Sequence, residues 1–499
     1  MTTSEIGILI SIIVYMVAII GIGVYYSQVN NSTEDFYLGG RKLGPFVTAM
    51  SAEASDMSSW LLMGLPGVAY LTGVCNAFWT AVGLGIGTYV NWLIVAKRLR
   101  KYSVICGDAI TVPDFFANRY RDKKVLKCVS ALMIIIFFVP YTASGFAACG
   151  KLFHSLFGVD YMAAMVISAI VIVAYTTLGG FWAASTSDFI QSIVMSVALI
   201  IVIGYGVYSV GGIDVVASNV KDLPGYINLN ATFDATTNSS SPYGIITIFS
   251  TLAWGLGYFG MPHILLRFMA IEDKNKIKLS RRIASVWVVI AMAIAILIGV
   301  IGHTMSQVGV IDNLKDSETI IVQIANVLSS HGILFAIIAG VILAGILAST
   351  MSTSDSQLLA ASSSVTENLM DGVLGIKLSE KAKVIVARCT VIGIAIVAIF
   401  LASNPDSSVF QIVSFAWAGF GSTFGPVMLF ALFWKRSNKY GAISGMVAGG
   451  AMVFIWKFVV RPLGGAWDIY ELLPAFIVAC VFIIVISLLT KAPEQEITD

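Results

Sequence analysis

The chain has 499 residues, of which 58% are hydrophobic and 12% are charged, and its mean hydropathy is +0.88. A soluble domain is about half apolar and about a quarter charged, so this composition indicates a protein that lies in lipid. The net charge is +2, and no basic cluster is interleaved with aromatic residues, which excludes a nucleic-acid-binding surface of the usual kind. The six cysteines and four histidines are scattered, without the spacing of a metal site.

Thirteen apolar runs are long enough to be membrane spans, because a helix needs about 20 residues to cross a hydrocarbon core of about 30 Å. The first run has no basic segment before it and no small-residue cleavage site, which predicts a retained helix rather than a signal peptide. The ninth is overlong and is expected to extend past the bilayer on its cytoplasmic side. The predicted spans are 5–26, 45–69, 76–97, 125–151, 161–180, 188–210, 243–264, 283–304, 332–366, 384–403, 408–434, 440–460 and 470–490.

The distribution of basic residues predicts the orientation of the chain. With the N-terminus outside, 25 of the 30 lysine and arginine residues fall on the inner side. Cytoplasmic loops carry an excess of these residues, so the N-terminus is predicted outside and, for an odd number of spans, the C-terminus inside. The outer segment 211–242 is polar and turn-rich, and we expect a loop there rather than a domain.

Two of the predicted spans contain sequence that interrupts a helix. The second contains SAEASDMSSWLLMGLPG, residues 51–67, and the seventh contains STLAWGLGYFGMP, residues 250–262. Glycine and proline weaken a helix interior, and in lipid the freed backbone groups are tolerated only where they face protein or a water-filled cavity. The two spans lie five apart, so two sets of five spans would enter the membrane from opposite sides, as in inverted-repeat transporters. Close helix packing through glycine is the alternative for either span alone.

Asp56 lies inside the first interrupted span. A carboxylate near mid-membrane normally faces a partner or a cavity on an ion or substrate path. No cationic partner for Asp56 is evident in the second or seventh span, which predicts a bound cation or a substrate ammonium group. Capping of the broken helix through backbone N–H groups is the alternative. Glu53, three residues earlier on the same helical face, has no assigned role.

The ninth span carries a second polar cluster. Hydroxyl and carbonyl oxygens are suitable ligands for a hard cation such as Na⁺, although serine and threonine also join membrane helices by hydrogen bonds. Asp355 adds a carboxylate to this helix. Asp188, at the start of the sixth span, is a third candidate acid, for which a helix N-terminal role is the alternative. The hydroxyl residues at helical spacing are Ser349, Ser352, Thr353 and Ser356.

Four aromatic residues lie in or beside the polar, glycine-bearing sequence near span centres. Most aromatic residues of membrane proteins are interface anchors or core. Near a broken helix, however, aromatic rings can enclose an apolar substrate or stack against a substrate ammonium. The four are Trp60, Tyr141, Trp254 and Tyr258.

Four long motifs cover these segments. They are YLGGRKLGPFVTAMSAEASDMSSWLLMGLPG at 37–67, WGLGYFGMPHILLRFMA at 254–270, ILASTMSTSDSQLL at 346–359 and FAWAGFGSTFGPVMLFALFW at 415–434. With these motifs the chain resembles the proline branch of the sodium:solute symporter family, in consistent order over nearly its whole length.

The resemblance implies an all-α polytopic membrane protein with a LeuT-type core of two inverted five-helix repeats. The single transporter domain, residues 1–499, would consist of an extra helix at 5–26, a first repeat at 45–210, a second repeat at 243–434 and two extra helices at 440–490. The implied activity is import of L-proline with Na⁺ by alternating access through a bacterial inner membrane. An enzymatic activity is not implied.

The resemblance also implies site residues. The implied sodium site uses the backbone carbonyls of Ala54, Met57 and Ser349 and the hydroxyls of Ser352 and Thr353, with Asp56 as the essential acid. The positions implied for proline binding or gating are Trp60, Gly64, Tyr141, Trp254, Tyr258 and Pro262. Arg41 and Asp188 match sensitive polar positions, and Asp188, Asp355 and Ser356 are candidates for a second sodium or a coupling role. Glu53 and Asp355 depart from the family pattern, which has a small residue and a serine there.

Three alternatives remain open on the sequence. A symporter of the same family could carry another small solute, such as pantothenate, a sugar or an osmolyte. A channel or sensor is less favoured, because no ring of charge or filter sequence is seen. A membrane-embedded enzyme is also disfavoured, since no HExxH, P-loop or Ser/His/Asp arrangement is legible.

Overall fold

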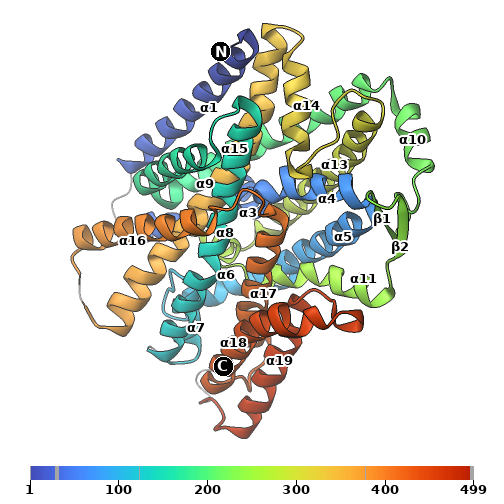
Figure 1. Cartoon of the computed structure of the whole chain (residues 1–499). Helices are drawn as coiled ribbons and strands as arrows, with labels where there is room; N and C mark the ends of the chain where they lie inside the picture. The colour runs from blue at the N-terminus through green and yellow to red at the C-terminus, as the bar shows by residue number, and fades with distance from the viewer. Residues whose placement is uncertain (1, 29–32, 123, 377, 495–499) are drawn as a thin grey trace.

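The computed structural model describes residues 2–28, 33–122, 124–376 and 378–494, and these fold almost entirely into helices (Figure 1). The α-helices are α1 (Thr3–Ser27), α2 (Thr33–Leu38), α3 (Pro45–Ser59), α4 (Leu65–Thr72), α5 (Val74–Val90), α6 (Ala96–Ile105), α7 (Val112–Arg119), α8 (Val125–Phe157), α9 (Tyr161–Ser209), α10 (Ile213–Lys221), α11 (Ile245–Leu252), α12 (Pro262–Ala270), α13 (Ile277–Gln307), α14 (Ile320–Ser329), α15 (Ile333–Ser363), α16 (Glu380–Leu401), α17 (Val409–Phe433), α18 (Lys439–Ile455) and α19 (Leu472–Leu489).

Shorter helical turns of other geometry connect or extend these helices. Those with π geometry are η2 (Trp60–Gly64), η3 (Asn91–Val95), η6 (Ser364–Val373) and η7 (Trp456–Val460). Those with 3₁₀ geometry are η1 (Gly39–Arg41), η4 (Ala253–Gly260), η5 (Ser317–Thr319), η8 (Arg461–Leu463) and η9 (Gly465–Trp467).

All thirteen predicted spans fall on helices. Nine helical segments of the described chain are long and apolar enough to cross a membrane, or ten if the bent pair Ile245–Gly260 and Pro262–Ala270 is one span. The predicted span 45–69 coincides with α3 plus α4. The predicted spans 161–180 and 384–403 coincide with the shorter apolar helices Tyr161–Ala174 and Ile385–Leu401, respectively. The number of spans and the placement of the termini relative to a bilayer stay predictions.

The helices form a bundle whose centre holds the two interrupted spans. At the N-terminal end, α1 packs along α9 and α15, whereas α18 and α19 pack on each other and on α17 at the C-terminal end (Figure 1). Between these ends, α3 packs on α9 and α15, and η4 packs on α5 and α17. Trp92, Tyr141 and Tyr258 are among the largest fully buried side chains, so the core surrounds the interruptions.

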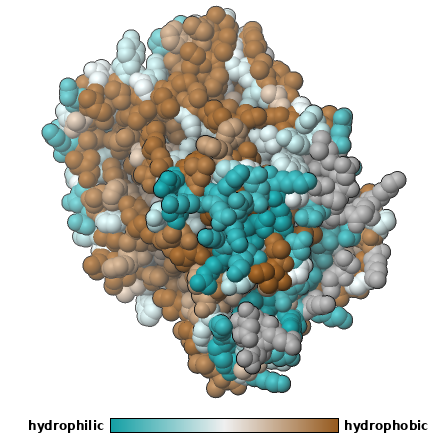
Figure 2. Space-filling model, turned by 180° about the vertical axis from the view of Figure 1, so that it is seen from behind, coloured by the Kyte–Doolittle hydropathy of each residue, from teal (hydrophilic) through white to brown (hydrophobic). Residues whose placement is uncertain are grey.

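The outside of the bundle is apolar. Val14 is 64% exposed and Leu489 77% exposed, on α1 and α19 respectively. Apolar side chains cover much of the face in Figure 2, around a hydrophilic patch. Because a soluble monomer rarely exposes a contiguous apolar patch of more than a few hundred Å², this surface fits contact with lipid.

The segment 211–242, predicted to be a loop, contains regular structure. It holds α10 and an antiparallel hairpin of β1 (Ala231–Asp234) and β2 (Ser239–Pro242). Phe233 anchors the hairpin by packing edge to face on Tyr226, with ring centroids 5.4 Å apart. Hydrogen bonds from the two threonines that follow Asp234 lower the pKa of that exposed carboxyl to about 2. The strands ATFD and SSSP are only four residues long and show no sustained hydrophobic alternation, which is why the sequence pattern did not indicate them.

Glycines let α5 lie directly against η4. A Cβ atom at Gly87 would lie 2.3 Å from the carbonyl oxygen of Gly255, and one at Gly83 would lie 2.5 Å from that of Leu252. Backbone atoms cannot move aside as a flexible side chain can, so this contact requires glycine in α5.

We expect Gly87→Ala to destabilise the protein by about 1–3 kcal/mol, as overpacking a filled core does. Gly204→Ala in α9 is the control, because a Cβ there has no atom within 4 Å. The measurement is the Tm of each purified variant in detergent. Equal Tm values for the two variants would contradict the role assigned to the contact between α5 and η4.

Candidate functional site

The first interruption is a local change of backbone conformation at Ser58. This residue has φ 46° and ψ −171°, far from helical values, between α3 and the π-helical turn η2. The Ser58 hydroxyl accepts a hydrogen bond of 3.1 Å from the Trp60 N–H. A left-handed φ is unfavourable for any residue other than glycine and persists only where its surroundings hold it. The predicted break in the second span is therefore confirmed, at Ser58.

The second interruption comprises η4, which continues α11, and a bend of 48° between Ile245–Gly260 and Pro262–Ala270. Its carbonyl groups are satisfied from neighbouring helices, because the Trp417 indole N–H donates to Trp254 O at 2.8 Å and the Asn91 amide donates to Tyr258 O at 2.9 Å. Such donors are required where backbone leaves the helix at membrane depth. Pro262 begins α12, where its missing N–H leaves no helical bond unmade.

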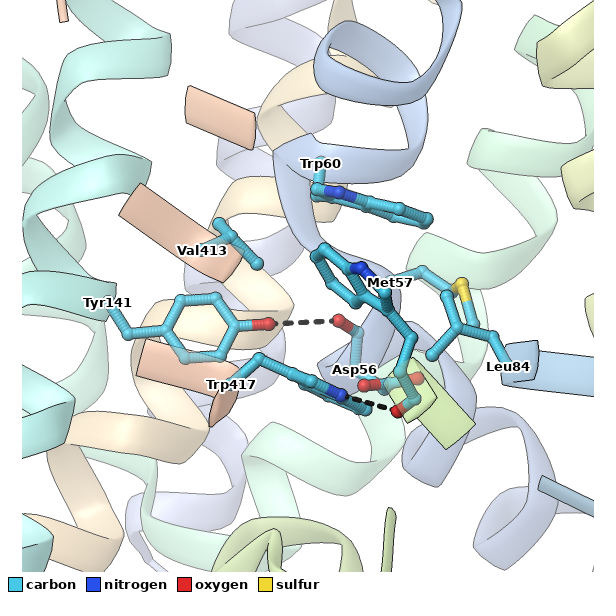
Figure 3. A pocket seen from close by; sticks show the side chains of 8 residues that line it. Asp56, Met57, Trp60, Leu84, Tyr141, Val413 and Trp417 are labelled. Atoms are coloured by element: carbon cyan, nitrogen blue, oxygen red, sulfur yellow. Dashed lines mark hydrogen bonds between the residues drawn. The ribbon is translucent and has the colours of Figure 1, made fainter. Parts of the chain in front are cut away.

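Asp56 joins the two interruptions. The Tyr258 hydroxyl donates to Asp56 Oδ2 at 2.5 Å. Figure 3 shows the second contact, in which the Tyr141 hydroxyl donates to the Asp56 backbone carbonyl at 3.2 Å. The indole rings of Trp60 and Trp254 lie 5.5 Å apart between centroids. Five residues predicted for the site thus lie together, from the second, fourth and seventh spans: Asp56, Trp60, Tyr141, Trp254 and Tyr258.

A small cavity lies between these side chains (Figure 3). Its volume is about 10 Å³, roughly the room that one water molecule needs. Both carboxylate and indole groups face it, so it offers polar and apolar contacts to a ligand. The residues that line it are Asp56, Met57, Trp60, Leu84, Tyr141, Trp254, Val413 and Trp417.

Phe410, at the start of α17, covers the aromatic side of this cavity. Its ring centroid lies 5.9 Å from that of Trp60 and 5.5 Å from that of Trp254. A Cβ atom at Gly64 would lie 3.3 Å from the Phe410 Cβ, so Gly64 packs against Phe410 and is not among the residues that line the cavity.

Glu318 holds the beginning of α17 in place. Its carboxylate accepts the backbone N–H groups of Val409 and Phe410, each at 3.0 Å, and contacts the Lys151 ammonium at 2.8 Å. A carboxylate at a helix N-terminus is favourable because the first N–H groups have no partner within the helix. The position of Phe410 therefore depends on Glu318.

The hydroxyl cluster of α15 meets the interruption of α3. The Ser352 hydroxyl donates to the Ala54 carbonyl at 2.8 Å and lies 3.2 Å from the Ser349 carbonyl, which also accepts from the Thr353 hydroxyl at 3.1 Å. The side chains of these α15 residues are buried, and Met57 follows on the same stretch of α3. These carbonyl and hydroxyl oxygens come from two helices, with Ala54 only two residues from Asp56 along α3, and form a set that a hard monovalent cation can use.

Asp188 and Asp355 lie in a separate buried cluster around Arg267. Arg267 Nη2 contacts Asp188 Oδ2 at 3.0 Å and donates to Ser356 Oγ at 2.6 Å, while Arg267 Nε donates to Ser51 Oγ at 3.1 Å. Asp355 Oδ1 accepts from Ser356 at 3.1 Å. Asp188 lies eight residues beyond the kink at Gly180 in α9, so it pairs with an arginine instead of starting a helix.

Arg267 lies beyond the end of the predicted span 243–264, yet it belongs to α12 and is 1% exposed. The signal that could have identified it is a single arginine within the apolar sequence PHILLRFMA, directly after the proline that starts the helix. Trp417, Val413, Leu84 and Phe410 were also missed, because residues on other helices are brought to the cavity only by packing.

Arg41 lies apart from both clusters. Its guanidinium donates to the carbonyls of Met269 at 3.0 Å and Ala109 at 2.7 Å and to the Ser103 hydroxyl at 3.2 Å, and it contacts Asp108 at 2.9 Å. It therefore ties the segment before α3 to the ends of α12 and α6.

The chain was compared with protein families and with curated proteins. Residues 36–449 match the model of the sodium:solute symporter family. The osmoregulated proline transporter OpuE of Bacillus subtilis is 42% identical over 493 residues, which cover 98% of this chain and 96% of that protein. A sodium/proline symporter of Staphylococcus aureus is 42% identical over 492 residues, covering 97% and 93%.

Solved structures of three transporters have the same fold at low sequence identity. A Na⁺-coupled sialic acid symporter in a substrate-bound outward-open state has a TM-score of 0.78 at 16% identity and covers 98% of this chain and 99% of its own. Mhp1, a nucleobase-cation-symport-1 transporter, has a TM-score of 0.56 at 13% identity, covering 94% and 98%. MhsT in complex with L-phenylalanine has a TM-score of 0.53 at 12% identity, covering 89% and 97%. The match to the family model and the two relatives that are 42% identical over nearly the whole chain show that the chain belongs to the sodium:solute symporter family.

Proposed function

We propose that the protein imports L-proline together with Na⁺, by alternating access around the cavity at Asp56. The observation that carries the proposal is the contact between the two interrupted spans, Tyr258 to Asp56, next to the oxygen cluster where Ser352 meets Ala54. Proline as the substrate is supported by the names of the relatives from Bacillus subtilis and Staphylococcus aureus, with which the chain shares 42% of its residues.

The sodium site that we propose lies between α3 and α15. Its ligands would be the carbonyls of Ala54, Met57 and Ser349 and the hydroxyls of Ser352 and Thr353. The Ser352 hydroxyl, which donates to the Ala54 carbonyl, would turn its lone pairs to the ion on binding. An ion held in this way ties α15 to the interrupted α3 and therefore favours one arrangement of the helices. By linkage, an ion that favours the state that binds substrate raises substrate affinity, and substrate raises ion affinity equally.

The proline site that we propose is the cavity lined by Trp60, Tyr141, Trp254 and Trp417. Proline is a zwitterion with a compact apolar ring, so it needs aromatic walls for the ring and polar groups for the two charges. N–H groups freed at the break near Ser58 are suited to a carboxylate, and the Asp56 region is suited to the imino group. Because the cavity measures about 10 Å³, admission of proline requires the ring of Phe410 and the indoles to move apart.

Movement of Na⁺ down its gradient supplies the driving force in this proposal. One elementary charge crossing the membrane gains about 2.3 kcal/mol per 100 mV. A tenfold ratio in concentration corresponds to about 1.4 kcal/mol. The membrane potential alone therefore supports more than tenfold accumulation for one ion per proline.

The cluster around Arg267 is assigned to coupling between helices rather than to ion binding. It links α3, α9, α12 and α15 through Ser51, Asp188 and Ser356, and the guanidinium already supplies a positive charge there. We extend this coupling role to Asp355 and to Arg41, which connects the start of α3 to α12.

We expect Ser352→Ala to raise the Na⁺ concentration that gives half-maximal proline uptake by about tenfold, since it removes a charge-assisted contact of about 1.5 kcal/mol. Asp56→Asn should raise it further. The assay is uptake of labelled proline into proteoliposomes under an imposed Na⁺ gradient. Ser362→Ala, another buried serine of α15, is the control and should leave the Na⁺ dependence unchanged.

This prediction fails if uptake in the wild type is unchanged when choline replaces Na⁺. That result would remove sodium coupling altogether. An unchanged Na⁺ dependence in Ser352→Ala would remove only the site between α3 and α15.

We expect Trp254→Ala to raise the KM for proline by at least tenfold while the Na⁺ dependence changes less, because the indole forms a wall of the cavity. A buried aromatic side chain contributes about 3–5 kcal/mol when truncated to alanine, so folding must be verified by gel filtration. Trp456→Ala, an indole at the end of α18, is the control.

Competition of unlabelled solutes against labelled proline distinguishes the alternatives within the family. Proline should compete at the lowest concentration. Stronger competition by pantothenate, a sugar or a betaine would replace proline as the substrate and leave the sodium site unaffected.

A further inference from the structure

A cavity that the proposed mechanism does not use lies where the end of α7, the start of α18 and the segment after α19 meet. Its volume is about 300 Å³, far larger than that of the cavity at Asp56. Four of the residues that line it are basic and one is acidic, so we call it the basic cavity. The lining residues are Arg119, Tyr120, Arg121, Asn438, Lys439, Tyr440, Lys491, Ala492, Pro493 and Glu494.

Hydrogen bonds hold the walls of the basic cavity together. The hydroxyls of Tyr120 and Ser437 lie 2.9 Å apart, which joins α7 to the turn before α18. Asn438 caps α18 by accepting from the Gly441 N–H at 3.0 Å, and its amide donates to the Lys491 carbonyl at 2.9 Å. Three segments that are distant in the sequence are thus fixed relative to one another around the cavity.

The positive charge of the lining is only partly neutralised. Arg121 Nη1 contacts Glu494 Oε2 at 2.6 Å, and Glu494 is the acidic residue of the lining. Lys439 and Lys491 make no ion pair among the described residues. The Nη1 atom of Arg119 is buried and has no hydrogen-bond partner in the described part of the chain. Three of the four lining cations therefore lack an acidic partner.

The other charged residues of the surrounding segments do not cancel this excess. Asp114 of α7 pairs with Lys127 of α8 at 2.6 Å, and Asp122 accepts backbone N–H groups at the start of α8. Arg436 donates to the Thr490 carbonyl at 2.8 Å and adds a positive charge. Further cations of these segments are Lys124 and Lys435, and the sequence after Glu494 contains the acids Glu496 and Asp499.

The basic cavity lies at the ends of candidate membrane spans. Three helices, α8, α18 and α19, belong to segments that are long and apolar enough to cross a membrane. The first begins four residues after Arg121, the second begins at Lys439, and the third ends two residues before Lys491. Beside these cations, Tyr440 and Leu489 are exposed. Basic and aromatic residues at span ends lie at the level of the lipid head groups, so the cavity adjoins both head groups and acyl chains.

We propose that the basic cavity binds the head group of an anionic phospholipid. The planar N–H groups of arginine match phosphate oxygens, and lysine adds point charges. Basic pockets between membrane helices accept such head groups. Inorganic phosphate would use the same charges, but it has no acyl chain for the exposed apolar surface of α19 next to the cavity.

The test counts lipids bound to the purified full-length protein by native mass spectrometry. The protein is titrated with phosphatidylglycerol, which is anionic, or with phosphatidylethanolamine of the same acyl chains, which has no net charge. Each basic residue near an anionic lipid is worth about fivefold in affinity, so the wild type should bind the first phosphatidylglycerol at least about tenfold more tightly. Lys439→Gln combined with Lys491→Gln should remove most of this preference and leave phosphatidylethanolamine binding unchanged.

Two matched variants make the result specific. Lys439→Arg combined with Lys491→Arg keeps both charges and should keep the preference. Lys274→Gln combined with Lys278→Gln removes two charges from exposed lysines at the start of α13, outside the lining of the cavity, and should also keep it. A Tm equal to that of the wild type verifies folding. Inorganic phosphate at the concentration of the lipid should not displace phosphatidylglycerol.

Equal affinity of the wild type for the two lipids overturns the proposal, including the case in which acidic residues of the C-terminal sequence occupy the cavity. Equal losses in the two glutamine variants also overturn it, because the surface potential alone then explains the preference. Displacement by inorganic phosphate contradicts a lipid as the ligand. The assay contains neither proline nor a Na⁺ gradient, so its outcome is independent of the proposed function.

Discussion

The hydrogen bond from the Tyr258 hydroxyl to the Asp56 carboxylate, 2.5 Å long, connects the interruption of α3 at Ser58 with the interruption at η4. Neither interruption would persist alone, because each leaves backbone groups without helical partners in an apolar surrounding. Together they are mutually supporting. Tyr141 donates to the Asp56 carbonyl, and Trp417 and Asn91 donate to the carbonyls of η4.

This constraint explains why the polar residues of an otherwise apolar chain are concentrated at its centre. Charged groups in lipid are costly and are retained where they bind ions, bind substrate or pair with one another. The core of this protein shows pairing in one cluster, where Arg267 contacts Asp188. Asp56 has no cationic partner among the described residues and accepts instead from Tyr258, while carbonyl and hydroxyl oxygens of α3 and α15 meet where Ser352 contacts Ala54. The cluster around Arg267 is thus internally paired, whereas the oxygens of α3 and α15 form the set that we propose for Na⁺.

The same arrangement links the site to the N-terminal end of α17. Phe410 covers the aromatic wall of the cavity, and the N-terminus of α17 that carries it is held by Glu318, itself in contact with Lys151 of α8. Because Glu318 of η5 caps α17 and contacts Lys151 of α8, the position of the Phe410 ring depends on η5, α8 and α17.

Much of the molecule could be predicted from the residues alone. The spans, the two interruptions and the acid at Asp56 are local properties, since hydropathy, glycine and proline content and a lone carboxylate act within one helix. What the sequence could not decide is which side chains from distant helices meet. Asp188 was open to a helix N-terminal role, and Arg267 and Trp417 were not singled out, because the groups they contact lie far away along the chain: 79 residues separate Arg267 from Asp188, and 163 separate Trp417 from Trp254. The sequence by itself thus determined the membrane character, the breaks and the chemistry available. Only the tertiary structure decided which of those groups are paired and which remain free, because pairing depends on the packing of helices and is not encoded in the spacing along any one of them.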